Sequence, residues 1–298
     1  MAARSHAFLP ARASLAVSGE DAKTFLQGLV SNDASKIDPA HARYGAFLTA
    51  QGRFLHEFLM LEAGGAVHLV AEAARLDDLQ RRLKIYKLRA KVALAPAPSL
   101  AVAAFWGERA AEAFGLADQA GAAVETGGGA ACVDPRLPAL GVCALMPADA
   151  IAALARTHGF AAAMAADYDR HRLALGVPDG SRDLPVEDAL LLENGFDELG
   201  GVDWKKGCYV GQEVTARMKY RALVRKRLLP VRIDGPAPAS GTRIMLGEAE
   251  AGEMRSSAGG LGLALLRLEA VEKAAADGLP LVAGDARLVP HKPGWANY

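Results

Sequence analysis

The sequence predicts an α+β protein that ends in a small β-barrel, and three observations lead to this prediction. The chain has 298 residues, which is too long for one small core and suits two or three packed subdomains. Strand-like and helix-like segments alternate through roughly the first 220 residues. Beyond them, short strand-like runs separated by turn clusters are typical of a small β-barrel or sandwich.

The composition excludes several classes of protein. Hydrophobic residues make up 51% of the chain and charged residues 23%, which is enough apolar material for a core and argues against overall disorder. The 34 Lys and Arg residues balance the 34 Asp and Glu residues, so we expect neither direct nucleic-acid binding nor membrane binding. No apolar run is long enough to span a bilayer, and no secretory signal is visible. We expect a soluble cytoplasmic protein, with an organellar transit peptide left open.

The cysteine count points to a reducing compartment. Cys132, Cys143 and Cys208 are the three cysteines, and no CxxC pair occurs among them. An odd number without such a pair argues against a disulfide framework or a zinc ribbon, so we expect no metal site. Cys132 and Cys143 lie in strand-like, apolar surroundings and are interpreted as packing residues.

Alternation and periodicity predict the elements of the first half of the chain. The segments expected to be strands are residues 14–17, 44–49, 54–61, 66–70 and 91–94. A short helix is expected to begin after Ser18 as its N-cap, with Asp21 as a capping-box-like partner. A longer helix is expected over about residues 72–88. The residues expected on the buried faces of these helices are Phe25, Leu26, Leu29, Leu76, Leu79 and Leu83.

The second half is expected to change character near Arg221. Residues 115–131 are rich in Ala and Gly and predict a helix end followed by a mobile loop. Helices are expected over residues 148–158 and 161–175, the second ending before Pro178. The later strands are expected at residues 226–233, 242–245, 261–266 and 286–289. The expected domains are residues 1–220 and a C-terminal β-barrel over residues 221–298.

The densest cluster of chemically useful residues surrounds Cys208. Lys205 and Lys206 precede the cysteine, and nearby positive charge favours the reactive thiolate over the thiol. Gly207 and Gly211 flank the Cys–Tyr–Val tripeptide and allow a sharp turn or a close approach of the backbone to a ligand. A ring for stacking follows at position 209, and a carboxylate at position 213 can accept the paired donors of a pterin. The alternative is a glycine-rich loop with an inert cysteine.

The octapeptide KGCYVGQE at residues 206–213 resembles the signature of the YgfZ/Iba57-like folate-binding proteins, a branch of the aminomethyltransferase superfamily. Basic residues follow this signature in the family, as Arg217, Arg221 and residues 225–227 do here. The resemblance extends over nearly the whole chain, although only the octapeptide is specific by itself. The other similar stretches are residues 19–22, 25–28, 32–33, 44–53, 134–136, 140–141, 172–173, 176–178, 184–185, 252–257 and 264–267.

The resemblance implies an aminomethyltransferase-like fold, with two interwoven α+β subdomains around a central folate site and a C-terminal β-barrel. The second subdomain is expected over roughly residues 46–130. The implied function is that of an accessory protein for iron–sulfur cluster assembly or repair, acting through Cys208, with an indirect effect on iron–sulfur-dependent tRNA modification. The implied cofactor is tetrahydrofolate or a one-carbon derivative. The implied partners are iron–sulfur client or assembly proteins, in the mitochondrial matrix if the source is eukaryotic.

The resemblance also implies a folate site. The residues expected to contribute to it are Trp204, Lys206, Gly207, Tyr209, Gly211, Gln212, Glu213 and Arg217. Trp204 is expected either in the pterin pocket or in interdomain core. The basic run at residues 217–227 is expected to be a solvated face or a site for the anionic polyglutamate tail.

One departure argues against glycine-cleavage chemistry. Transferases of the superfamily carry paired Asp residues after a Gly-Gly, and His56 and Glu57 stand in the comparable place here. Glu57 is able to do acid–base work, but its side chain is longer; the other interpretation is a pair on a strand surface. We therefore do not expect a classical transferase. The alternative function is a folate-dependent aminomethyltransferase or a related one-carbon transferase, and thiol chemistry at Cys208 is the other enzymatic class.

Overall fold

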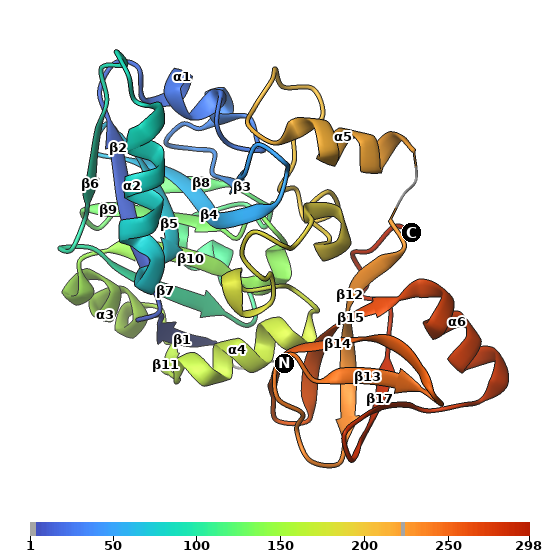
Figure 1. Ribbon diagram of the computed structural model, residues 1–298. Helices are drawn as coiled ribbons and strands as arrows, with labels where there is room; N and C mark the ends of the chain where they lie inside the picture. Colours follow the sequence, from blue (N-terminus) through green and yellow to red (C-terminus); the bar gives the residue numbers. More distant parts are fainter. Residues whose placement is uncertain (1–3, 222–223) are drawn as a thin grey trace. The chain divides into compact units, whose positions relative to one another are not determined.

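The computed structural model describes residues 4–221 and 224–298 and divides into two compact units (Figure 1). Each unit is assembled from three stretches of the chain. The first comprises Met1–Ala50, Leu55–Tyr168 and Leu199–Val210, and the second comprises Gln51–Phe54, Asp169–Glu198 and Gly211–Tyr298. The predicted division at residues 220 and 221 and the predicted second subdomain stay predictions, and residues 222–223 lie outside the described residues.

A five-stranded sheet forms one layer of the first unit, with the order β3-β4-β5-β2-β6. Its strands are β2 (Arg12–Ser18), β3 (Arg43–Leu48), β4 (Phe54–Ala63), β5 (Ala66–Glu72) and β6 (Ala93–Pro96). All five were predicted within a few residues, because each alternates or runs apolar between clear turns. Helix α2 (Leu76–Tyr86) packs on this sheet through Leu76, Leu79 and Leu83, as the helical period predicted.

The predicted N-cap of helix α1 (Ala22–Gln27) is wrong. Its buried residues Phe25 and Leu26 lie where the sequence placed them, but the N-cap position is occupied by Asp21 rather than by Ser18. No side-chain hydrogen bond caps this helix. The reason is that Ser18 belongs to β2 and continues its ladder, pairing with Ala93 of β6.

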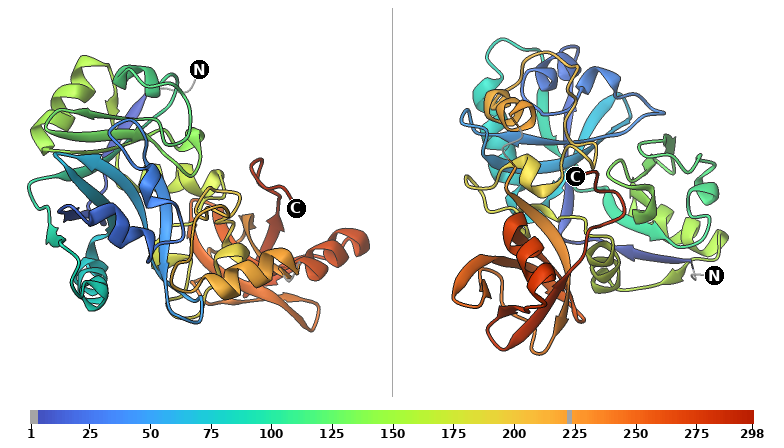
Figure 2. Two further views of the ribbon diagram at one scale, coloured as in Figure 1. Left: turned by 90° about the horizontal axis from the view of Figure 1, so that it is seen from above. Right: turned by 90° about the vertical axis from the view of Figure 1, so that its right-hand side faces the viewer.

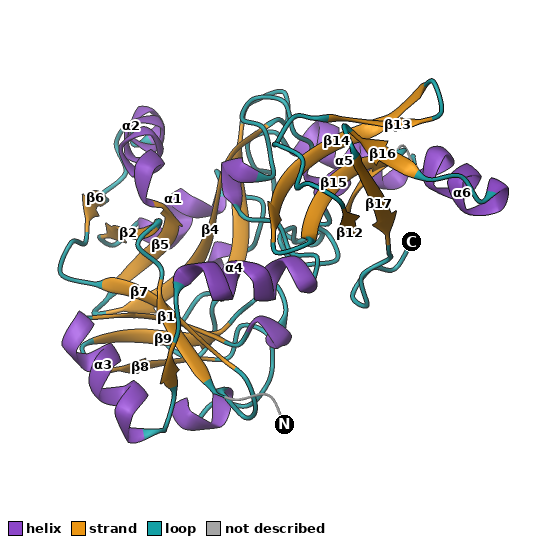
Figure 3. Ribbon diagram, turned by 90° about the horizontal axis from the view of Figure 1, so that it is seen from below, coloured by secondary structure: helices purple, strands orange, loops and turns teal. Residues whose placement is uncertain are grey.

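A six-stranded sheet forms the other layer, with the order β11-β1-β7-β10-β9-β8. Its strands are β1 (Ser5–Phe8), β7 (Ala101–Trp106), β8 (Ala123–Thr126), β9 (Gly129–Val133), β10 (Val142–Met146) and β11 (Ala161–Ala162). Helix α3 (Ala148–Thr157) covers it with Ile151 and Ala155 (Figure 3). The chain starts in this sheet, forms the whole five-stranded sheet and then returns, so the two layers are interwoven.

The β8–β9 hairpin overturns the prediction of a mobile loop over residues 115–131. Gly129 begins β9, and a Cβ atom built there would lie 2.0 Å from the main-chain oxygen of Leu145 in the neighbouring strand. The small residues of this stretch therefore serve close packing between strands, which removes the hydrophobic pattern that normally reveals a strand. The predicted helix over residues 161–175 is also shorter: α4 covers Ala165–Ala174, because residues 161–162 pair with β1.

The C-terminal part of the second unit is a closed six-stranded barrel with the order β12-β15-β14-β13-β16-β17 (Figure 2). Its strands are β12 (Lys226–Asp234), β13 (Arg243–Leu246), β14 (Ala249–Ala258), β15 (Leu261–Arg267), β16 (Leu281–Ala283) and β17 (Ala286–Pro290). Helix α6 (Leu268–Asp277) packs on its core, and helix α5 (Gln212–Tyr220) precedes it. The predicted C-terminal barrel is confirmed.

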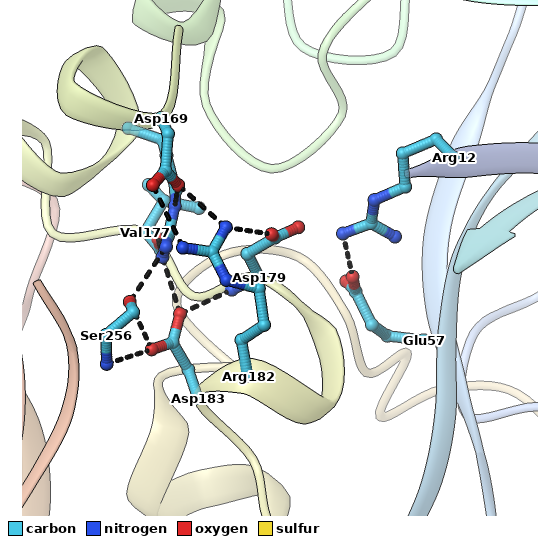
Figure 4. A network of polar contacts seen from close by, with 9 residues as sticks. Arg12, Glu57, Asp169, Val177, Asp179, Arg182, Asp183 and Ser256 are labelled. Atoms are coloured by element: carbon cyan, nitrogen blue, oxygen red, sulfur yellow. Dashed lines mark hydrogen bonds and ion pairs between the residues drawn. The ribbon is translucent and has the colours of Figure 1, made fainter. Parts of the chain in front are cut away.

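A buried ion network fastens α4 to the barrel strand β14 within the second unit (Figure 4). Asp183 is fully buried and accepts hydrogen bonds from the Arg172 guanidinium at 2.5 Å and from the Ser256 hydroxyl at 2.5 Å. Arg172 also donates to Asp169 of the same helix and to Ser256. A charge that is buried in this way must keep its partners, so the network fixes α4 firmly to the barrel.

Candidate functional site

The loop before Cys208 is anchored by the ammonium group of Lys206. This side chain is only 8% exposed, and its Nζ donates to three main-chain oxygens: those of Gln27 at 2.8 Å, Val30 at 2.5 Å and Asn32 at 2.8 Å. An ammonium has three protons, so all of its donors are used. Burial lowers the pKa of Lys206 to about 8, against the raising influence of Asp33 and Asp203.

The approach to this loop is held by the polar turn that follows α1. The Asn32 amide donates to the main-chain oxygens of Gly200 at 2.6 Å and Tyr44 at 2.7 Å, and the Ser31 hydroxyl donates to that of Gly201 at 2.6 Å. Asp203 accepts from Lys36 at 2.6 Å. Burial raises the pKa of Asp203, but this hydrogen bond and those from two main-chain amides outweigh it and lower the pKa.

Cys208 is the exposed thiol of the chain, whereas Cys132 and Cys143 are buried. The two buried cysteines face each other across the β9–β10 ladder. Burial raises the pKa of Cys132 well above its usual value and that of Cys143 to about 12, so both stay protonated and unreactive. The interpretation of these two as packing residues is confirmed.

Tyr209 lies next to the thiol but points into the protein. It is 7% exposed, and the Lys206 ammonium lies 5.1 Å from the centre of its ring, within the range of a cation–π interaction. The Val210 amide donates to the oxygen of Gly28 at 3.3 Å, which ties the loop to the end of α1. Gly207 is exposed, and Trp204 is half-buried. The loop therefore presents Cys208 outward from a fixed base.

The remaining signature residues belong to the second unit. Gly211 has a left-handed backbone with φ 82° and precedes α5, which begins at Gln212. Glu213 and Arg217 are exposed on this helix and form an ion pair at 2.7 Å. Arg227 departs from the expected solvated face: it is 8% exposed and donates to Glu198 at 2.7 Å.

A second candidate site is a buried polar cluster in the first unit. Glu57 is 2% exposed and accepts from Arg12 at 2.6 Å (Figure 4). The Arg136 guanidinium lies 5.6 Å from the ring centre of Tyr44 and is held by Asp134, with one contact at 2.7 Å. Burial raises the pKa of Tyr44 strongly, and the nearby Glu57 adds to this rise. The cluster combines a carboxylate with several donors.

The interpretation of His56 and Glu57 as a surface pair is wrong. Both side chains are buried, each 2% exposed, and they point to opposite faces of β4 because adjacent strand residues alternate. His56 Nε2 lies 2.9 Å from the Asp78 carboxylate of α2, and burial lowers its pKa to about 4. Residues 4–221 and 224–298 contain no group of three or more His, Cys, Asp or Glu residues arranged to hold a metal ion.

Three known families or proteins are similar to this chain in sequence. Residues 225–298 match the family described as CAF17, C-terminal beta-barrel domain. The mouse protein named iron–sulfur cluster assembly factor IBA57, mitochondrial, is 36% identical over 287 residues, covering 89% of this chain and 78% of that protein. The human protein of the same name is 36% identical over 285 residues with the same coverage.

The chain belongs to the IBA57 family. The suspected YgfZ/Iba57-like relationship is therefore confirmed. A crystal structure of the glycine cleavage system aminomethyltransferase T from Bartonella henselae matches the fold with a TM-score of 0.77. It covers 99% of this chain and 87% of that chain at 15% sequence identity. This match confirms the predicted aminomethyltransferase-like fold and shows the fold alone.

The structure of this IBA57-family chain brings predicted site residues together within each unit. The Lys206 ammonium contacts the ring of Tyr209, and the exposed Cys208 lies between these two residues in the sequence. Within the second unit, Glu213 contacts Arg217. Asn32 and Asp203, which anchor the loop, were not predicted from the sequence as site residues. Their signal was present, since each lies in a short polar turn among residues that bind main-chain groups well.

No described helix of this IBA57-family chain combines the length and the apolar character that crossing a membrane requires.

Proposed function

We propose that this chain supports the assembly or repair of iron–sulfur enzymes through the thiol of Cys208. The observation that carries the proposal is the exposure of this thiol on an anchored loop, whereas the other two cysteines are buried. The relatives named as iron–sulfur cluster assembly factors support it. One cysteine cannot hold a cluster alone, so a bound cluster takes further ligands from a partner. Two other reactions are open to Cys208: its thiolate can take the outer sulfur of a donor persulfide and release the donor's thiol, or it can attack a client disulfide and release one client thiol.

The test uses cells that lack the protein and carry the wild type, Cys208→Ser or Cys143→Ala. We expect Cys208→Ser to lose most of the activity of iron–sulfur enzymes and, downstream, of iron–sulfur-dependent tRNA modification. Cys143→Ala is the matched control, because it removes a buried thiol from the same unit. Full activity with Cys208→Ser at wild-type protein abundance would refute the proposal. We propose the cytoplasm as its site in bacteria and the mitochondrial matrix in eukaryotes, in line with the relatives' names.

Tetrahydrofolate, or a one-carbon derivative of it, is the cofactor that we propose. The polar cluster of the first unit fits a reduced pterin, because a carboxylate has about four lone-pair sites, so Glu57 can accept paired N–H donors in addition to its hydrogen bond from Arg12. Bound folate would supply a carrier for one-carbon groups. Lys206 uses all of its ammonium protons on main-chain oxygens, so we propose that it contributes by holding Tyr209 and the loop in place.

The folate proposal is tested by titrating the protein with tetrahydrofolate and 5-formyltetrahydrofolate while following tryptophan fluorescence. We expect saturable binding by the wild type and by Cys208→Ala, and at least tenfold weaker binding by Glu57→Gln, because that change removes the carboxylate charge. Absence of saturable binding by the folded wild type would exclude the cofactor. Equal binding by Glu57→Gln would move the folate site away from the polar cluster.

A folate-dependent one-carbon transferase is the second candidate, favoured by the burial of Glu57 among cations in an aminomethyltransferase-like fold. In this case the protein would transfer the methylene carbon of an aminomethyl donor to tetrahydrofolate and release its nitrogen as ammonia, and Glu57→Gln would abolish both products while Cys208→Ser would not. Product formation below the limit of detection with saturating folate would exclude this candidate and leave the assembly role.

A further inference from the structure

An exposed apolar and basic segment follows the end of α2 in the first unit. Residues 84–91 have the sequence KIYKLRAK. Three large apolar side chains are solvent-exposed there: Ile85 is 68% exposed, Tyr86 is 40% exposed and Leu88 is 89% exposed. Leu88 also has a left-handed backbone with φ 41°, which is rare for a bulky residue and costs roughly 1–2 kcal/mol. Exposed apolar residues that cluster in this way mark surfaces for interaction.

The charge of this segment is positive in a chain whose net charge is zero. Residues 79–92 contain six Lys and Arg residues and no Asp or Glu. Some of these cations are neutralised, since Lys91 pairs with Glu20 and Arg82 pairs with Asp78. Lys84, Lys87 and Arg89 are exposed and have no ion pair among the residues that the structure describes. The apolar side chains are thus surrounded by uncompensated positive charge.

Direct contacts link this segment to the loop of Cys208. The ring of Tyr86 lies edge-on to that of Phe47, with 5.9 Å between ring centres. Phe47 forms a β-bridge with Val30, whose oxygen accepts the hydrogen bond from Lys206. The exposed thiol follows Lys206 by two positions. Residues 84–91 are therefore connected to the loop of Cys208 through three successive contacts within the first unit.

We propose that residues 84–91 form the docking surface for the protein partner whose atoms meet Cys208. The partner is a protein with an acidic rim around an apolar socket: the socket receives Leu88 and Ile85, and the rim pairs with Lys87 and Arg89. Such complementarity steers partners together and places apolar anchors at the centre of the contact. This inference rests on the proposed function, because it takes the thiol to act on a partner.

A protein fits this surface better than a membrane or a nucleic acid does. The apolar face of α2, formed by Leu76, Leu79 and Leu83, is already packed on its sheet, so no continuous amphipathic face is left for a bilayer. A nucleic acid backbone offers phosphates to the cations but no apolar socket for Leu88. A protein is the partner class that satisfies the apolar and the charged parts together.

The test combines cross-linking in cells with binding by the purified full-length chain. A photo-reactive amino acid replaces Leu88, and Met164, which is 69% exposed in the same unit, is the control position. We expect one acidic protein to be captured at position 88 and not at 164, and the same protein to be captured by a thiol cross-linker through Cys208. With that protein purified, Arg89→Glu is expected to weaken binding at least tenfold. Arg156→Glu reverses the charge of an exposed residue on α3 and is expected to leave binding unchanged.

Several outcomes would overturn the inference, and the cellular assay separates them from failure of the proposed function. If Arg89→Glu and Leu88→Ser retain wild-type iron–sulfur enzyme activity while Cys208→Ser loses it, the thiol function stands and this docking surface is wrong. If Cys208→Ser also retains activity, the proposed function itself fails and the inference fails with it. The wild type is also tested for binding to phosphatidylglycerol vesicles and to an oligonucleotide of about 20 nucleotides. If it binds either one and Arg89→Glu abolishes that binding, the segment serves a different class of partner and the inference is wrong.

Discussion

Replacing Lys206 by methionine tests whether its ammonium group organises the loop that carries Cys208. Methionine keeps the length and the apolar stem of the side chain but removes all three donors. The main-chain oxygens of Val30 and Asn32 are buried and would lose their partner, whereas that of Gln27 is partly buried and can turn to water. The change therefore isolates one group of hydrogen bonds.

The expected destabilisation is the balance of two opposing effects. A buried acceptor that loses its partner costs about 1–3 kcal/mol, so the two buried oxygens together cost about 4 kcal/mol, and the Gln27 oxygen adds about 1 kcal/mol. Against this, the variant no longer buries a charge: burial lowers the pKa of Lys206 from 10.5 to about 8, which corresponds to about 3 kcal/mol. We expect a net loss of about 2 kcal/mol in the free energy of unfolding.

Two measurements check this expectation. Denaturant unfolding should show the loss in Lys206→Met and not in Lys205→Met, because Lys205 is an exposed neighbour. Hydrogen exchange should show faster exchange of the Val210 amide, which bonds to Gly28 in the wild type, by about tenfold or more. Wild-type stability together with wild-type exchange of this amide in Lys206→Met would show that the three hydrogen bonds do not hold the loop.

Three further predictions concern acid, a buried ion pair and a close backbone contact. The pKa of His56 is lowered to about 4, so the folded state binds fewer protons than the unfolded state between pH 6.5 and 4, and stability falls as the pH falls through this window. His56→Gln, which keeps a polar partner for Asp78, should remove about 2 kcal/mol of the loss between pH 7 and pH 4.5, measured by denaturant unfolding at both pH values; an equal loss in the wild type and the variant would contradict this. Asp183→Asn should cost about 3–5 kcal/mol by unfolding calorimetry, because the buried Arg172 loses the fully buried one of its two carboxylate partners and keeps only Asp169; a loss below 1 kcal/mol would contradict the network. Gly252→Ala should shift the barrel NMR resonances and lower the melting temperature, because its Cβ would lie 2.1 Å from a main-chain oxygen of the neighbouring strand; an unchanged spectrum would count against it.

The fold was predictable where each strand or helix shows its own period. The strands of the five-stranded sheet alternate or run apolar between clear turns, and α2 repeats Leu at helical spacing, so local pattern and tertiary structure agree. The β8–β9 hairpin was not predictable in this way, because Gly129 and its alanine neighbours are chosen for close strand approach rather than for hydrophobic contrast. β14 was missed as well, since its residues Ala249–Ala258 include Gly, Glu and Ser within the strand.

The candidate site was predictable in its residues but not in its connections. The octapeptide around Cys208 is visible in the sequence, and so is the contrast with Cys132 and Cys143 in apolar surroundings. The acceptors of Lys206 are not visible, because Val30 lies 176 positions earlier in the chain and offers only its main-chain oxygen. Every residue has a main-chain oxygen, so the type of residue does not reveal that this oxygen accepts a hydrogen bond. The burial of Glu57 was not predicted for a related reason: its partner Arg12 lies on a different strand of the sheet, far away in the sequence.

The discontinuous assembly of the first unit has a consequence for biosynthesis. Its last stretch, Leu199–Val210, carries Cys208, whereas Cys132 and Cys143 belong to an earlier stretch. Because the ribosome makes the chain from its N-terminus, β9 and β10 emerge first and can withdraw their two thiols into the sheet. The exposed thiol is therefore synthesised last. The order of segments separates the exposed cysteine from the two buried cysteines in time.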